Sequence, residues 1–200
     1  MPVYLAIFFT IEHFITDNYW PTQTAIDNYI PFCEYFALFY VTWSPILAAL
    51  GIYLIIKDGE GFRRYMWTIM FTFTVSTLIC ALIPNGQDLR PAVMERDNIF
   101  TWMVQYTYSI DTNTNVFPSV HVVGAIGAAW AVKKTPSLER RTLLRGATAI
   151  LALLICLSTL FIKQHAVLDV IGGLGLALAV GLPLYHHGII RRSRPAMEQE

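Results

Sequence analysis

A histidine and an aspartate lie four residues apart in the segment STLFIKQHAVLD, at His165 and Asp169. Residues at this spacing share one face of a helix. A carboxylate bonded to one imidazole nitrogen fixes the tautomer and leaves the other nitrogen free to attack an electrophile. The alternative is a purely structural hydrogen bond between helices. Because both residues are costly in an apolar environment, we regard them as a candidate nucleophile and its orienting acid.

A second histidine follows a helix-start signal in the segment NVFPSVH, residues 115–121. Pro118 suits the first position of a helix, because its missing N–H would have no partner there. The N–H groups of Ser119, Val120 and His121 would then point out of the helix end, which favours an anion such as phosphate. Ser119 adds a hydroxyl, and His121 adds a group that exchanges protons near neutral pH. Taken alone, the segment is more simply interpreted as a plain helix start.

Two cations lie close to these histidines in the expected topology. Arg90 stands in the segment NGQDLRP, and Lys163 lies just before the candidate nucleophile. Two histidines, one aspartate, two cations and a helix N-terminus describe a phosphoryl-transfer site that needs no metal. Asn85 and Gln87 are further candidates, although a polar loop residue is usually only solvated. The chain shows no cofactor motif and no zinc-ligand spacing.

The elements that position these residues belong to a strongly apolar chain. Of its 200 residues, 55% are apolar and 14% are charged, whereas globular proteins average about 25% charged residues. The mean hydropathy is +0.49. These values favour an integral membrane protein over a soluble domain, and the zero net charge disfavours disorder and nucleic-acid binding. The three cysteines lie in or beside apolar runs and are expected to be packing residues without a disulfide: Cys33, Cys80 and Cys156.

Six segments are candidates for membrane-spanning helices, each of which needs about 20 mostly apolar residues. We expect an all-α bundle of six transmembrane helices with the site at the outer membrane interface, in a single integral membrane domain over residues 1–200. The expected spans are the N-terminal run MPVYLAIFFTIEHF and residues 35–56, 65–83, 116–132, 146–162 (extended back towards Arg141) and 170–190.

Positive charges divide unequally between the two ends of these spans. Eleven of the fourteen Lys and Arg residues fall on one side, within residues 57–64, 133–145 and 191–194, and the other side carries Arg90, Arg96 and Lys163. The positive-inside rule makes the first side cytoplasmic. Both termini are then cytoplasmic and the candidate site faces outward. We expect a bacterial plasma membrane, and a eukaryotic organelle membrane with the site facing the lumen fits the same topology.

The outer loop contains the segment DNIFTWMVQYTY, residues 97–108. It can form a short helix at the membrane interface, with Asp97 as N-cap and Trp102, Tyr106 and Tyr108 at the depth of the lipid head groups. The alternative is an irregular loop whose aromatic side chains pack on the bundle.

Small residues on two spans favour a close approach of the site segments. Both spans show the small-xxx-small spacing that lets helices pack closely in lipid. The residues are Gly124, Gly127, Ala128 and Ala131 on one span and Gly172, Gly173, Ala177 and Gly181 on the other. If these faces pack together, His121 and His165 meet near the outer interface.

The order and spacing of these clusters resemble the type 2 phosphatidic acid phosphatase superfamily of membrane lipid phosphatases. Its motifs are KxxxxxxRP, PSGH and SRxxxxxHxxxD, and its membrane members carry six helices. The matching residues are Arg90 and Pro91 for the first motif, residues 118–121 for the second, and Ser158, His165 and Asp169 for the third. The resemblance covers about residues 30–190.

Three positions depart from these motifs. Ile83 replaces the first-motif Lys, Val120 replaces the Gly of PSGH, and Thr159 replaces the third-motif Arg. Two phosphate-binding cations of the superfamily are therefore absent, and Lys163 can replace one of them. These departures resemble the branch that includes inositol phosphorylceramide synthases and related head-group transferases.

The resemblance implies a division of labour among the site residues. His165 attacks phosphorus to form a phosphohistidine, Asp169 orients His165, and His121 protonates the leaving oxygen and then activates water or an alcohol. The phosphoryl oxygens are held by cations, a hydroxyl and helix-end N–H groups, from Arg90, Lys163, Ser119 and Val120.

The expected function is that of a metal-independent membrane lipid phosphatase acting on a phosphomonoester or pyrophosphate of a lipid. Its partners are then a lipid phosphate and the bilayer, with no cofactor. One alternative is a lipid head-group phosphotransferase. Another is a non-catalytic membrane transporter or scaffold with the same fold.

Overall fold

The computed structural model describes residues 18–138 and 140–186, together with Ile7 and Thr10. This part of the chain is mostly helical, which confirms the helical class. Its α-helices are α2 (Ala37–Lys57), α3 (Gly59–Leu82), α4 (Ile99–Ile110), α5 (Val120–Lys134), α6 (Thr142–Phe161) and α7 (Val167–His186). The 3₁₀ helices are η1 (Ala25–Tyr29), η2 (Glu34–Phe36) and η3 (Pro136–Leu138). A short parallel pair joins β1 (Trp20–Pro21) to β2 (Asn85–Gly86).

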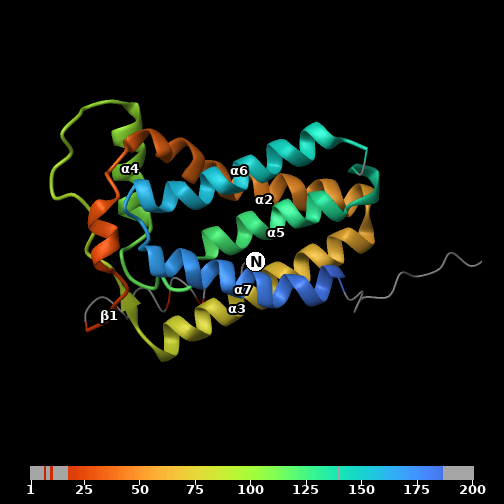
Figure 1. Ribbon diagram of the computed structural model, residues 1–200, viewed down its shortest axis with the longest axis horizontal. Coiled ribbons are helices and arrows are strands. Elements are labelled where there is room, and N and C mark those ends of the chain that lie inside the picture. The colour runs from red at the N-terminus through yellow and green to blue at the C-terminus, as the bar shows by residue number, and fades with distance from the viewer. Residues whose placement is uncertain (1–6, 8–9, 11–17, 139, 187–200) are drawn as a thin grey trace, which may run out of the picture.

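Helix α5 lies among α2, α3, α6 and α7 and packs against all four (Figure 1). Most of its side chains are buried, because its glycines and alanines let the neighbouring helices approach. A Cβ on Gly124 would lie 2.7 Å from Nε1 of Trp43 on α2, and one on Gly127 would lie 3.5 Å from Cγ2 of Thr68 on α3. The glycines of α5 therefore face α2 and α3, so the prediction that they face α7 is wrong.

The glycines of α7 do face α5 and the segment before it. A Cβ on Gly173 would lie 2.8 Å from the carbonyl oxygen of Ser119. A Cβ on Gly172 would lie 2.3 Å from the ring of Phe117. This close approach brings the start of α7 against the start of α5. The expected meeting of the two histidine segments is thus confirmed, with α7 supplying the small residues.

The bundle buries polar side chains beside its apolar core and exposes large apolar side chains on its outer faces. Helix α3 buries a row of hydroxyl-bearing residues: Thr68, Thr72, Ser76 and Thr77. The outer helix faces expose large aliphatic side chains such as Ile52 (61% exposed), Ile150 (62%) and Leu143 (89%). An apolar exterior of this kind is typical of helices that face lipid. In such bundles the interior polar side chains form hydrogen bonds within a helix or between helices.

Within the described residues, four helical segments are long and apolar enough to cross a membrane: Glu34–Lys57, Gly59–Leu82, Thr142–Phe161 and Val167–Tyr185. They are compatible with an integral membrane protein, and α6 confirms the expected extension towards Arg141. Helix α5 has 15 residues, a length of about 22 Å against a hydrocarbon core of ~30 Å. The expected N-terminal span and residues 187–190 lie outside the described residues. The six-span count stays a prediction.

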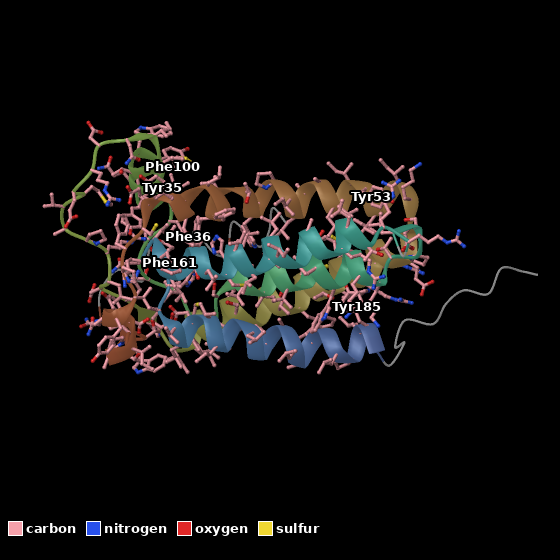
Figure 2. All side chains as sticks on the ribbon, turned by 45° about the horizontal axis from the view of Figure 1, so that its top comes forward. Tyr35, Phe36, Tyr53, Phe100, Phe161 and Tyr185 are labelled. Carbon is pink, nitrogen blue, oxygen red and sulfur yellow. The ribbon has the colours of Figure 1, made fainter. Side chains whose placement is uncertain are left out.

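The two ends of the bundle are built differently. The α2–α3 and α5–α6 connections lie at one end, and α4, the β1–β2 pair and the α6–α7 turn lie at the other, called here the site end (Figure 1). At the site end Phe36 of η2 stacks on Phe161 of α6, with ring centroids 4.4 Å apart. Figure 2 shows this pair far from Tyr53 and Tyr185, which mark the opposite end.

Helix α4 confirms the helix expected in the long loop and corrects its cap. The N-cap is Asn98, whose side-chain oxygen accepts hydrogen bonds from the backbone N–H groups of Phe100 and Thr101 at 2.9 and 3.0 Å. Asp97 as N-cap is therefore wrong by one residue. Trp102 and Tyr106 are exposed and stack on each other. Tyr108 instead points inward, where its hydroxyl donates to the carbonyl of Ile162.

Candidate active site

His165 lies in the turn between α6 and α7. The carbonyl of Thr159 accepts hydrogen bonds from the backbone N–H groups of Gln164 and His165, both at 3.0 Å. Lys163 adopts φ +57°, which reverses the chain within this turn. Thr159, at the place of the superfamily's arginine, is fully buried. Its backbone therefore anchors the candidate nucleophile, while its side chain donates to the carbonyl of Cys156.

Asp169 meets His165 from the first turn of α7. Its Oδ2 lies 3.6 Å from Nδ1 of His165 and accepts a hydrogen bond of 2.7 Å from the backbone N–H of Ala166. Because His165 precedes the helix, the prediction of one shared helical face is wrong, although the expected pairing of the two side chains is present. Both residues are buried. Among the described residues, Nδ1 of His165 and Oδ1 of Asp169 have no hydrogen-bond partner, so the 3.6 Å contact is an ion-pair distance.

His121 completes the cluster from the first turn of α5. Its Nδ1 lies 3.5 Å from Nε2 of His165. Two aromatic rings of α2 hold the imidazole: Tyr40 stacks on it at 4.3 Å between centroids, and Trp43 lies at 4.3 Å with a tilt of 40°. The hydroxyl of Tyr40 donates to Asp111 at 2.6 Å. The ring plane of His121 is therefore set by side chains that the sequence analysis did not identify.

The start of α5 differs from the expected one. Ser119 is the N-cap, its hydroxyl accepts from the N–H of Val122 at 3.5 Å, and Val120 is the first helical residue. The prediction of Pro118 in that first position is wrong by two residues. The N–H of Ser119 donates to the carbonyl of Asp169 at 3.1 Å. This leaves Val120 and His121 to supply the N–H groups of the first turn, which have no partner within a helix.

Arg90 reaches the histidine turn through Gln164. Its guanidinium donates to Oε1 of Gln164 at 2.7 Å and to the carbonyl of Asp111 at 2.6 Å. It also lies 4.2 Å from the centroid of the Tyr108 ring. Burial raises the pKa of that tyrosine, which keeps its hydroxyl neutral. Arg90 is thus bound to Gln164, the residue that precedes His165 in the turn.

Lys163 is held by a residue that the sequence analysis missed. Its Nζ donates to the carbonyl of Asp27 in η1 at 2.8 Å. The Asp27 carboxylate accepts from the N–H of Val167 at 2.7 Å, at the first residue of α7, and from the N–H of Thr24 at 2.7 Å. Burial lowers the pKa of Lys163, and the charge of Asp27 opposes this effect. The spacing of Thr24 and Asp27 signals a local cap, but not the long-range contact with the turn.

Asn85 and Gln87 are fully buried parts of the loop framework. Asn85 accepts from the N–H of Phe117 at 2.8 Å and donates to the carbonyl of Ile83 at 2.8 Å. Gln87 donates to the carbonyls of Lys163 and Gln164 at 3.0 and 3.2 Å. Both side chains therefore bind the backbone of the segments that carry the histidines, without reaching the imidazole rings. Neither is in contact with His121 or His165 in any hydrogen bond of the described residues.

Ser158 has the same supporting character. It is fully buried, and its hydroxyl donates to the carbonyl of Ile155 at 2.6 Å within α6.

The three cysteines are free, as expected. Within the described part of the chain, no group of three or more His, Cys, Asp or Glu side chains is arranged to hold a metal ion.

The fold and site define a helical protein, compatible with a membrane location, whose helix ends bring two histidines and an aspartate together. A family model described as the PAP2 superfamily, the type 2 phosphatidic acid phosphatases, matches residues 12–182. The chain belongs to this superfamily. Comparison with curated proteins and with solved structures found no match.

Proposed function

We propose that this protein is a membrane lipid phosphatase that hydrolyses a phosphomonoester or pyrophosphate of a lipid through a phosphohistidine intermediate. Membership of the PAP2 superfamily indicates phosphatase or phosphotransferase activity on phosphorylated substrates. The observation that carries the finer proposal is the line of side chains Asp169, His165 and His121. Nδ1 of His165 faces the carboxylate at 3.6 Å while Nε2 faces His121 at 3.5 Å.

In the first step, Nε2 of His165 attacks phosphorus and the bond from phosphorus to the leaving oxygen breaks. The leaving oxygen takes a proton from His121, so the lipid departs as an alcohol from a phosphomonoester and as a lipid monophosphate from a pyrophosphate. Asp169 stabilises the positive charge that develops on the His165 ring, because its carboxylate lies beside Nδ1. In the second step, neutral His121 takes a proton from water, the hydroxide attacks phosphorus, and the P–N bond breaks to release phosphate and free His165.

The contact between the two imidazoles adds a condition to this mechanism. A phosphoryl group attacked by one ring and protonated through the other must lie between them. The separation of 3.5 Å between Nδ1 of His121 and Nε2 of His165 is that of two nitrogen atoms in direct contact. Substrate binding therefore moves the rings apart or turns them. His165 is in a turn and His121 is clamped between Tyr40 and Trp43, so we expect His165 to make the larger movement.

Three kinds of donor serve the phosphoryl oxygens in this proposal. The first is the pair of N–H groups at the first turn of α5, from Val120 and His121. The second is the Ser119 hydroxyl, and the third is the cationic pair of Arg90 and Lys163. Lys163 has three N–H donors, of which the carbonyl of Asp27 accepts one. The site end would face the outside of the cell, as the distribution of basic residues predicts.

The test is product analysis by mass spectrometry with the purified full-length protein in detergent, in the presence of a metal chelator. A panel of lipid phosphates and lipid pyrophosphates is expected to yield free phosphate, and His165→Ala is expected to abolish turnover while the helical circular dichroism spectrum is unchanged. Acid quenching during turnover is expected to trap phosphate on His165. Full activity of His165→Ala would refute the mechanism.

A head-group transferase is the second candidate, favoured by Ile83 and Thr159 at the places of two superfamily cations. Thr159 is fully buried and its carbonyl holds the turn, so this position supplies no cation to the site. In this case His121 would activate an alcohol in the second step instead of water. A new phospholipid that forms only when an acceptor alcohol is added, without release of free phosphate, would identify this activity. No product and no labelled His165 across the whole panel would favour a non-catalytic transporter or scaffold.

A further inference from the structure

A small pocket lies at the site end, between η2, the loop before α4 and α4 itself. Its volume is about 230 Å³, below the range of about 300–1,000 Å³ that is typical of sites for drug-sized ligands. Its polar lining residues are Glu34, Glu95, Arg96 and Thr101. Figure 2 shows the adjoining aromatic pair, Tyr35 and Phe100, whose ring centroids lie 5.2 Å apart. The lining includes neither candidate histidine, so this pocket is separate from the candidate active site.

Thr101 brings a buried hydroxyl to the pocket. The residue is 3% exposed, and among the described residues its Oγ1 has no hydrogen-bond partner. A threonine inside a helix can donate to the carbonyl of an earlier turn, as Thr107 of the same helix does to Met103 at 2.9 Å. Thr101 lies in the first turn of α4, where no earlier helical turn precedes it. Because a buried hydroxyl without a partner is unfavourable, this group indicates a position that binds a ligand.

Glu34 and Arg96 form an ion pair at the same pocket. Nη1 of Arg96 lies 3.0 Å from Oε1 and 3.3 Å from Oε2 of Glu34, whose side chain is 3% exposed. The side-chain amide of Asn98 donates to the same Oε1 at 3.3 Å. The ion pair by itself would only join η2 to the loop before α4. It leaves Oε2 able to accept a second hydrogen bond and further N–H groups of the guanidinium able to donate.

The charges of the lining favour a neutral ligand. Two carboxylates and one guanidinium line the pocket, which disfavours an anion. A cation would compete with Arg96 for the buried carboxylate of Glu34. A hydroxyl group donates to a carboxylate and accepts from a guanidinium without adding a charge. Several hydroxyls on one small molecule therefore match the polar lining, and its C–H groups match the apolar wall of Phe32 and Met94.

We propose that this pocket binds a small polyhydroxylated group, a polyol or a sugar, through Thr101, Arg96 and Glu34. This inference goes beyond the proposed function and does not depend on it, because these three residues take no part in the proposed phosphoryl transfer. The same chemistry has two possible sources. One is a free polyol in the water at the site end, and the other is the sugar head group of a neighbouring lipid.

The binding test is isothermal titration calorimetry on the full-length protein in a detergent without a sugar head group. Glycerol, mannitol and glucose are the polyol probes, inorganic phosphate is the anion probe and choline is the cation probe. We expect a polyol to bind more tightly than either ion. Thr101→Val is expected to weaken its binding about tenfold, because one hydrogen bond at a buried position is lost. Thr101→Ser keeps the hydroxyl and is expected to retain binding.

Thr107→Val is the matched control, since this buried threonine of the same helix lies outside the lining and bonds Met103. It is expected to leave polyol binding unchanged, and thermal unfolding verifies that each variant is folded. Binding by none of the three polyols would overturn the proposal. Equal affinity of the unmodified protein and Thr101→Val would also overturn it, and so would tighter binding of phosphate or choline than of any polyol.

A second set of measurements separates this pocket from the proposed function and identifies the source of the ligand. His165→Ala is expected to bind the polyol as the unmodified protein does, and loss of binding in that variant would place the ligand at the histidines and refute the pocket. In nanodiscs, a glycosylated diacylglycerol without phosphate is added as a competitor. Weaker binding of the free polyol would assign the pocket to a lipid head group, and unchanged binding would assign it to the free polyol. Phosphatase activity without any polyol binding would retain the proposed function and reject the pocket.

Discussion

At the scale of single residues, two buried acids each contact two parts of the histidine turn. Asp169 accepts from the N–H of Ala166 and lies beside the ring of His165, so one carboxylate contacts both the start of α7 and the proposed nucleophile. Asp27 does the same from η1, where its carboxylate binds Val167 and its carbonyl binds Lys163. Changes at these two acids are therefore expected to affect both catalysis and the packing of the start of α7.

Replacement of Asp169 by Asn is expected to lower kcat/KM at least about 10²-fold, because the amide can still accept from Ala166 but no longer stabilises a charged imidazole. Phosphate release and the thermal unfolding midpoint of the purified protein measure the two effects separately. Asp88→Asn, an exposed acid that bonds Tyr19, is the control. A fully active Asp169→Asn enzyme with normal trapping of phosphate on His165 would contradict the assigned role.

The charge of Lys163 predicts a pH dependence. Burial lowers its pKa below the usual lysine range. Since only the protonated ammonium binds phosphate, kcat/KM is expected to fall as the pH rises through that lowered pKa, at a pH below ~10.4. Lys163→Arg stays protonated and is expected to lose this alkaline limb of the pH–rate profile. An identical limb in both proteins would assign it to another group.

At the scale of elements, the two histidines meet because α7 and α5 start against each other. The positions of Gly172 and Gly173 permit this approach, since side chains there would run into Phe117 and into the backbone of Ser119. The buried pair Asn85 and Gln87 then ties the loop after α3 to the segments before α5 and α7. The supporting loops thus behave as one framework around the histidine turn.

Gly173→Ala is expected to destabilise the protein by about 1–3 kcal/mol, because its Cβ would lie 2.8 Å from the carbonyl oxygen of Ser119. It is also expected to lower kcat, since relief of the overlap moves α5 away from α7. Gly175→Ala on the same helix is the matched control, because a Cβ there meets nothing within 4 Å. Thermal unfolding in detergent and phosphate release measure both variants. Equal behaviour of the two would contradict the packing argument.

At the scale of the whole molecule, the bundle separates a basic end from the site end. The last turns of α2 and α5 carry Lys57, Lys133 and Lys134, on the end opposite the histidines. The apolar outer faces between the two ends match a bilayer in character. The positive-inside rule predicts an orientation with the site end outside.

Accessibility labelling tests this orientation. In a variant whose three cysteines are replaced by alanine, Val93→Cys lies exposed at the site end and Leu143→Cys lies exposed at the start of α6, at the opposite end. A membrane-impermeant maleimide added to intact bacterial cells is expected to label the first, and the second only after permeabilisation. The reverse pattern would place the site on the cytoplasmic side.

The sequence alone determined the helical class and located the four long apolar helices of the described residues among six expected spans, because hydrophobic runs are a local property. Motif spacing is a local property too, and it selected the two candidate histidines and the candidate aspartate. His121, His165 and Asp169 were identified from residue type and spacing, and so was the superfamily to which the chain belongs. The helix in the long loop was anticipated as one of two alternatives, and its cap was misplaced by one residue because Asp97 and Asn98 are both good caps.

Only the tertiary structure decided which polar groups reach the histidines. A polar side chain has the same chemistry whether it binds a substrate or a backbone carbonyl. Packing alone therefore selected the partners of four candidate residues: Arg90, Lys163, Asn85 and Gln87. Tyr40 and Trp43 are ordinary aromatic residues of an apolar helix until α5 brings His121 between them. Asp27 lies more than a hundred residues from the turn that it holds, and no local pattern can encode a contact that depends on how helices approach one another.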